Sequence, residues 1–205
     1  MLQALKRKRI HIGPEDHGRR MSLDAFDHAI AEDGYQYELA KGVIEVSEVP
    51  KPEHAKQVQA IRNQLGRYQD DHPDAIELIA SSNECKLLVG PSKSERHPDV
   101  SLYLSAQPDI SDVWSIWIPQ IVVEVVSESS RKRDYEQKPP EYLALGVDEY
   151  WIVDAAKNQM TVLTRWRGEW KPAILKPPKR YSTHLLPGFS LDLNRVIVAG
   201  KPAES

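Results

Sequence analysis

Glu124 is the residue whose type and position most directly predict chemistry in this chain. It interrupts the run Ile121–Val126, in which every other residue is apolar and β-branched, as in a fully buried central strand. An ionised carboxylate in such a strand is costly unless a metal ion or another cation compensates its charge. The run therefore predicts a metal site, with a salt bridge to a neighbouring side chain as the alternative.

Asp99 provides a second carboxylate, at the start of another expected strand, Asp99–Leu104. Hard divalent cations such as Mg²⁺ take oxygen ligands and are typically bound by one or two carboxylates. Two acids on two neighbouring strands therefore predict one shared cation. Taken alone, Asp99 is equally well explained as a turn residue that follows Pro98.

The length and composition describe a soluble globular protein. The chain has 205 residues, of which 40% are hydrophobic and 28% are charged, and no apolar stretch is long enough to cross a bilayer. We expect a basic and polar N-terminal tail over residues 1–20 and a single domain over residues 21–205, large enough for a sheet with helices packed on it.

Charge and cysteine content restrict the partners and the compartment. The formal net charge of −3 argues against a protein that coats nucleic acid nonspecifically, although it allows a local basic surface. The basic run Lys6–Arg9 is expected to be a solvated tail, because no apolar core follows it as in a secretory signal. The single cysteine, Cys85, excludes an internal disulfide and fits a cytoplasmic protein.

Periodicity predicts a mixture of helices and strands. Lys41-Gly42 joins two alternating runs, residues 35–40 and 43–49, as in a β-hairpin. An apolar stripe predicts a long helix over residues 53–68 with His54 in its first turn, and Ser22 is expected to cap a short helix that ends at Gly34. Further strands are expected at residues 75–80, 85–89, 99–104, 121–127, 149–154, 160–166 and 189–193. The strand, helix and strand over residues 118–154 predict a crossover unit within a mixed sheet.

One ordered set of residues carries a family resemblance. The set comprises Tyr37-Glu38-Leu39, Gly42, His54, Pro98-Asp99, Val123–Ser127, Asp134, Lys138, Tyr142, Gly146-Val147 and Glu149–Asp154. It resembles the Uma-two family of endonucleases, which is similar to the PD-(D/E)XK, or restriction-endonuclease-like, superfamily. The resemblance implies an α/β fold, with a restriction-endonuclease-like mixed central sheet flanked by helices and additional β-hairpins.

The resemblance also implies roles for the acidic residues. Asp99 and Glu124 become metal ligands for Mg²⁺ or Mn²⁺, together with the carbonyl of Val125, and Glu38 becomes an accessory carboxylate near the same cation. His54 would help Glu38 to orient the attacking water, although a histidine in a first helical turn is also expected as a plain surface residue.

The catalytic lysine is displaced from its usual place in the superfamily. That place, two residues after the acid, is occupied by Val126, and the resemblance assigns the role to Lys138 on the following helix. Lys138 precedes Pro139-Pro140, and a residue before proline is disfavoured in the helical region. We therefore expect the helix to begin at Pro139 with Lys138 near its N-cap.

The activity implied is a Mg²⁺-dependent endonuclease that hydrolyses phosphodiester bonds in DNA, acting as a homodimer that cuts two strands. A loop with Ser127, Ser129, Arg131 and Arg133 would grip the nucleic-acid backbone, or would otherwise be a solvated turn. Two other functions stay open: a nuclease-fold module that binds nucleic acid or protein without turnover, and a hydrolase of a smaller phosphate ester, because a fold does not fix a substrate.

Overall fold

The computed structural model describes residues 10–201, so the basic run Lys6–Arg9 lies outside the described residues. The chain forms two compact units. The first contains the described residues up to Val49 together with Leu88–Arg96, and the second contains Pro50–Leu87 and the residues from His97 onward. No helix within residues 10–201 is long and apolar enough to cross a membrane.

The first unit begins with short elements that lie partly in the segment expected to be a tail. Strand β1 (His11–Ile12) pairs in parallel with β2 (Ile30–Ala31), and a 3₁₀ turn, η1 (Pro14–Asp16), follows β1. Ser22 caps α1 (Leu23–Asp27) as expected, by accepting a hydrogen bond from the Ala25 amide. The prediction that this helix extends to Gly34 is wrong, because the Ile30 amide pairs with the Ile10 carbonyl and places Ile30 in β2.

The predicted hairpin of the first unit is confirmed. Strands β3 (Tyr35–Ala40) and β4 (Val43–Glu48) are antiparallel, and Lys41 and Gly42 both have positive φ, at 52° and 76°, as a tight hairpin turn requires. The sheet has the order β4-β3-β7-β6, with β6 at Leu87–Val89 and β7 at Ser94–Arg96. Its pairing sets Glu38 directly opposite Glu45.

The second unit is built on a six-stranded mixed sheet with the order β12-β11-β10-β9-β8-β5. Its strands are β5 (Leu78–Ala80), β8 (Val100–Tyr103), β9 (Ile121–Val125), β10 (Glu149–Asp154), β11 (Gln159–Trp166) and β12 (Glu169–Leu175). Only β9 and β10 are parallel neighbours, as the predicted crossover unit requires, and the other pairs are antiparallel. Strand β12 was not predicted from the sequence.

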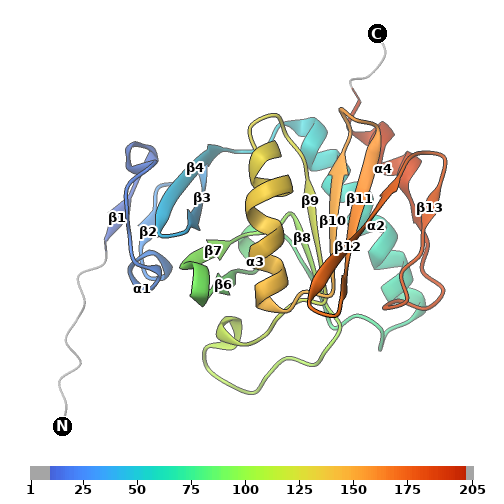
Figure 1. Cartoon of the computed structure of the whole chain (residues 1–205), viewed down its shortest axis with the longest axis horizontal. Coiled ribbons are helices and arrows are strands. Elements are labelled where there is room, and N and C mark those ends of the chain that lie inside the picture. Colours follow the sequence, from blue (N-terminus) through green and yellow to red (C-terminus); the bar gives the residue numbers. More distant parts are fainter. Residues whose placement is uncertain (1–9, 202–205) are drawn as a thin grey trace. The chain divides into compact units, whose positions relative to one another are not determined.

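Helices cover both faces of this sheet (Figure 1). On one face, α2 (Pro52–Asp71) and α4 (Leu193–Ala199) pack on a core formed by side chains such as Val123 and Trp151. On the other face, α3 (Lys138–Leu145) brings Tyr142 against Val122, Tyr150 and Ile152. Successive side chains of β9 point to opposite faces of the sheet, so the residues of this strand are divided between two hydrophobic cores. The short pair β13 (Arg180–Tyr181) and β14 (Leu191–Asp192) precedes α4, a helix that the sequence did not predict.

The predicted start of α3 at Pro139 is wrong. Lys138 is helical, with φ −70° and ψ −36°, and a π-helical segment, Arg133–Gln137, runs directly into α3. The Lys138 amide donates to the Arg133 carbonyl, five residues earlier. In an α-helix each proline ring would clash with the carbonyl four residues before it, and the wider π-turn relieves that crowding. The helical path therefore continues through Lys138.

Candidate active site

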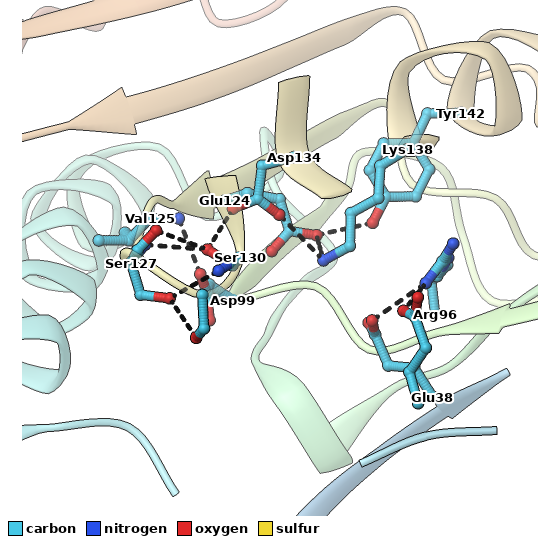
Figure 2. A network of polar contacts seen from close by, with 12 residues as sticks. Glu38, Arg96, Asp99, Glu124, Val125, Ser127, Ser130, Asp134, Lys138 and Tyr142 are labelled. Atoms are coloured by element: carbon cyan, nitrogen blue, oxygen red, sulfur yellow. Dashed lines mark hydrogen bonds and ion pairs between the residues drawn. The ribbon is translucent and has the colours of Figure 1, made fainter. Parts of the chain in front are cut away.

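Strand pairing in the second unit brings Asp99 and Glu124 together. Val100 of β8 is opposite Val123 of β9, so Asp99, one residue before β8, comes opposite Glu124. The two carboxylates predicted as metal ligands thus lie at the same end of two neighbouring central strands, as Figure 2 shows. This juxtaposition is the one that the sequence analysis expected.

Asp99 is held by two donors. Its Oδ2 accepts a hydrogen bond from the Val125 amide, at 2.7 Å, and lies 3.1 Å from Nε2 of His54, in the first turn of α2. Burial alone would lower the pKa of His54, but the hydrogen bond and charge of Asp99, aided by the charge of Glu124, raise it above its ordinary value. The structure therefore makes His54 a partner of Asp99 rather than a plain surface residue.

Glu124 is 3% exposed and is neutralised by a lysine. Its Oε1 accepts hydrogen bonds from Nζ of Lys138, at 2.9 Å, and from the hydroxyl of Tyr142, at 2.7 Å. Because Lys138 is itself only 4% exposed, the pair lies where removal of either charge would leave the other buried without compensation. Despite the prolines that follow it, Lys138 reaches Glu124.

Asp134 adds a third carboxylate that the sequence analysis did not assign to the site. It is 1% exposed, its Oδ1 lies 3.3 Å from Nζ of Lys138, and its Oδ2 accepts a hydrogen bond from the Ser130 hydroxyl at 2.6 Å. Burial and the charge of Asp99 raise the pKa of Asp134, although Lys138 and Ser130 oppose that shift. The spacing Asp134, Lys138, Tyr142 could have indicated the cluster, because residues four apart share one helical face.

The serines expected to bind nucleic acid take part in a local turn. The amides of Ser127 and Ser130 each donate to the other serine's hydroxyl, at 2.9 and 3.1 Å, and the Ser127 and Ser129 hydroxyls lie 3.2 Å apart. Figure 2 shows Ser127 and Ser130 beside Asp99 and Glu124. The turn ends at the helical segment that carries Asp134.

The two arginines of this loop differ in their surroundings. Arg131 forms a two-pronged ion pair with Asp154, which is fully buried and also accepts from the Tyr135 hydroxyl. Burial would raise the pKa of Asp154, but the hydrogen bonds from Arg131 and the Lys157 amide lower it. Arg131 therefore anchors the start of the helical segment to the end of β10. Arg133 is half-buried in the π-helical segment. Phosphate contacts by this loop stay a prediction.

Glu38 belongs to the first unit, whereas Asp99 and Glu124 belong to the second. Within the first unit, Nη1 of the fully buried Arg96 donates to Glu38, at 3.2 Å, and to Glu45, at 3.1 Å. The sequence analysis did not identify Arg96. The role of Glu38 as an accessory ligand stays a prediction.

The donor set at Asp99 and Glu124 fits a hard divalent cation. Lys138 contacts the carboxylates of Glu124 and Asp134, and burial, aided by the charge of Asp99, raises the pKa of Asp134. Within residues 10–201, no group of three or more acidic, histidine or cysteine side chains could hold a metal alone. Two carboxylates with a backbone carbonyl and water suit Mg²⁺, which usually retains several waters.

Comparisons with known proteins agree with this fold. A sequence model of the Uma2 family, described as "Putative restriction endonuclease", matches residues 23–194. A crystal structure described as a putative nuclease belonging to DUF820, from Anabaena variabilis ATCC 29413, is similar with a TM-score of 0.72 and 15% sequence identity. The alignment covers 88% of this chain and 99% of that one. Among curated proteins, none matches the chain.

Proposed function

The chain belongs to the Uma2 family, described as putative restriction endonucleases, and we propose that it is a Mg²⁺-dependent endonuclease that hydrolyses phosphodiester bonds in DNA. The observation that carries the proposal is the opposition of Asp99 and Glu124 at the end of neighbouring strands, with the buried ammonium of Lys138 on Glu124. A purely structural ion pair would need only one acid for one lysine, whereas Lys138 contacts both Glu124 and Asp134.

The ligands would be the carboxylates of Asp99 and Glu124 with the carbonyl of Val125. When bound, Mg²⁺ or Mn²⁺ supplies Lewis-acid chemistry, activating water and offsetting negative charge on the phosphate. The Val125 amide and His54 restrain the Asp99 carboxylate, and Tyr142 restrains that of Glu124. These hydrogen bonds hold the two acids in place before substrate arrives, which lowers the reorganisation that catalysis requires.

Lys138 would stabilise the charge that develops on the phosphate. Its ammonium lies among Glu124 and Asp134, and neighbouring carboxylates favour the charged form of a lysine. A positive charge that is positioned in advance within a buried site acts more strongly than one in water. Loss of this charge should therefore reduce turnover while the oxygen ligands remain.

A plasmid-nicking assay tests the proposal. Wild-type protein should convert supercoiled DNA to open circles with Mg²⁺ or Mn²⁺, and D99N and E124Q should not. K138A should lose about 10²-fold to 10³-fold in rate, the usual effect of removing one group that stabilises transition-state charge. K132A, which removes an exposed lysine from the start of the same helical segment, is the matched control and should keep its activity.

A binding module without turnover is the second candidate. The observation that favours it is the burial of Lys138, whose ammonium already contacts two carboxylates. Wild-type protein that binds DNA but cuts neither plasmid nor linear duplex with any of Mg²⁺, Mn²⁺, Co²⁺ or Ca²⁺ would support the module and reject the enzyme.

A further inference from the structure

Positive charge is concentrated in one segment of the second unit, residues 165–180. The segment contains six basic residues and a single acid, Glu169, whereas the whole chain has a formal net charge of −3. It comprises the end of β11, the tight turn at Arg167-Gly168, the edge strand β12 and the loop that follows. Charge of one sign is therefore placed on an edge of the sheet rather than spread over the surface.

Four of the six cations are exposed and form no ion pair within residues 10–201: Arg167, Lys171, Lys176 and Lys179. The other two have structural partners. Arg165 donates to the carbonyls of Val147 and Leu143, and Arg180 donates to Ser190 and pairs with Asp192. Ion pairing among the described residues therefore does not explain why these four exposed cations cluster.

An aromatic side chain lies next to these cations. Trp166 is 63% exposed, and the guanidinium carbon of Arg167 lies 5.5 Å from its ring centroid. Exposed aromatic rings among basic residues are typical of nucleic-acid surfaces, because bases stack on the ring while cations contact phosphates. We call Trp166, Arg167, Lys171, Lys176 and Lys179 the basic hairpin.

Strand register relates the basic hairpin to the candidate active site within the same sheet. Leu175 of β12 pairs with Met160, Met160 with Val153, and Val153 with Val125. Lys176 follows Leu175 directly, so it leaves the sheet at the end where Glu124 lies, whereas Trp166 pairs with Glu169 at the opposite end of β12. Three strand spacings separate β12 from β9, which corresponds to about 14 Å, or about four base pairs at 3.4 Å per step of duplex.

We propose that the basic hairpin is a docking surface for the phosphate backbone of nucleic acid, running along the edge of the sheet that carries Glu124. The argument is charge complementarity: four exposed cations and an exposed indole lie on one edge of an otherwise acidic protein. The inference rests on the proposed nuclease function, because it names the surface that would hold that enzyme's substrate.

Salt dependence of binding tests the proposal without any cleavage. Binding of a fluorescent 30-base-pair duplex would be followed by anisotropy in EDTA, from low to high KCl, with the full chain. Each phosphate contact contributes about 0.9 to the slope of log affinity against log salt concentration. The variant R167Q/K171Q/K176Q/K179Q should therefore bind more weakly, with a slope shallower by about three to four.

A matched variant controls for the change in net charge. K41Q/K56Q/K93Q/K201Q removes four exposed lysines elsewhere on the chain and should keep the wild-type slope. Equal slopes for the two quadruple variants would overturn the proposal. If the first variant unfolds, R167Q/K171Q should still lower the slope by about two, and an unchanged slope there would be equally decisive.

Two further measurements distinguish single-stranded from duplex nucleic acid, and nucleic acid from a second copy of this chain. W166A should weaken binding of a 20-nucleotide single strand by about tenfold if the ring stacks on a base, more than it weakens duplex binding. If a second copy of the chain pairs with the β12 edge instead, light scattering should show a dimer in wild type. The variant R167Q/K171Q should then lose the dimer and keep its affinity for DNA. That result would reject the proposal. Since EDTA prevents cleavage, failure of plasmid nicking would reject the nuclease and not this surface.

Discussion

Replacement of Lys138 by methionine would remove the ammonium that donates to Glu124 and leave the shape of the side chain largely intact. The side chains of Glu124 and Asp134 are only 4% and 1% exposed, so solvent cannot take over the role of the lysine. Breaking a buried ion pair from one side typically costs about 3–5 kcal/mol. Because Tyr142 and Ser130 still donate to the two acids, we expect a loss near the lower end, about 3 kcal/mol.

Thermal unfolding at pH 7 measures this loss. For a chain of this size, 1 kcal/mol corresponds to about 2–4 °C in Tm, so K138M should melt about 6–12 °C below wild type. K132M, at an exposed lysine, should stay within about 0.5 kcal/mol of wild type.

The loss should depend on pH in a defined direction. Burial already raises the pKa of Asp134, and without the opposing charge of Lys138 it rises further above the unfolded value, so the variant takes up a proton on folding. The deficit in stability is then largest above the raised pKa of Asp134 and shrinks as the pH falls through it. A K138M protein as stable as wild type at pH 7, or equally destabilised at pH 5 and pH 8, would refute the assignment of Lys138 as the compensating charge.

Three further outcomes follow from the same contacts. Mg²⁺ or Mn²⁺ should raise the Tm of wild type, and a shift that persists in D99A/E124A would place the ion elsewhere. The pKa of His54 is raised from an ordinary 6.5, so the ion pair of protonated His54 with Asp99 stabilises the fold below about pH 6.5. This stabilisation is lost as the pH rises through the folded-state pKa. The variant H54Q should therefore show a larger decrease in Tm at pH 6 than at pH 9. The pKa of Asp154 is lowered from 3.8, so its stabilisation is present above that value and is lost as the pH falls through the folded-state pKa. D154N should accordingly be destabilised at pH 7 and approach wild type in acid unfolding.

The sequence alone determined the elements whose signals are local. The β-branched run around Glu124, the Lys41-Gly42 turn and the apolar stripe of α2 each depend on residues near one another in the chain, and each predicted element is present. The placement of Glu124 in a buried strand also predicted a compensating cation, because an isolated charge there would be too costly.

Only the tertiary structure decided which partners those residues find. The register of β8 against β9 brings Asp99 opposite Glu124, and the π-turn before Pro139 carries Lys138 to Glu124. Neither can be read from local propensity, since register depends on pairing across the sheet and the preference of a residue before proline is weak compared with a buried ion pair. The partner of Arg131 is also set by the tertiary structure. From the sequence alone its guanidinium could face solvent, but the end of β10 places Asp154 beside it.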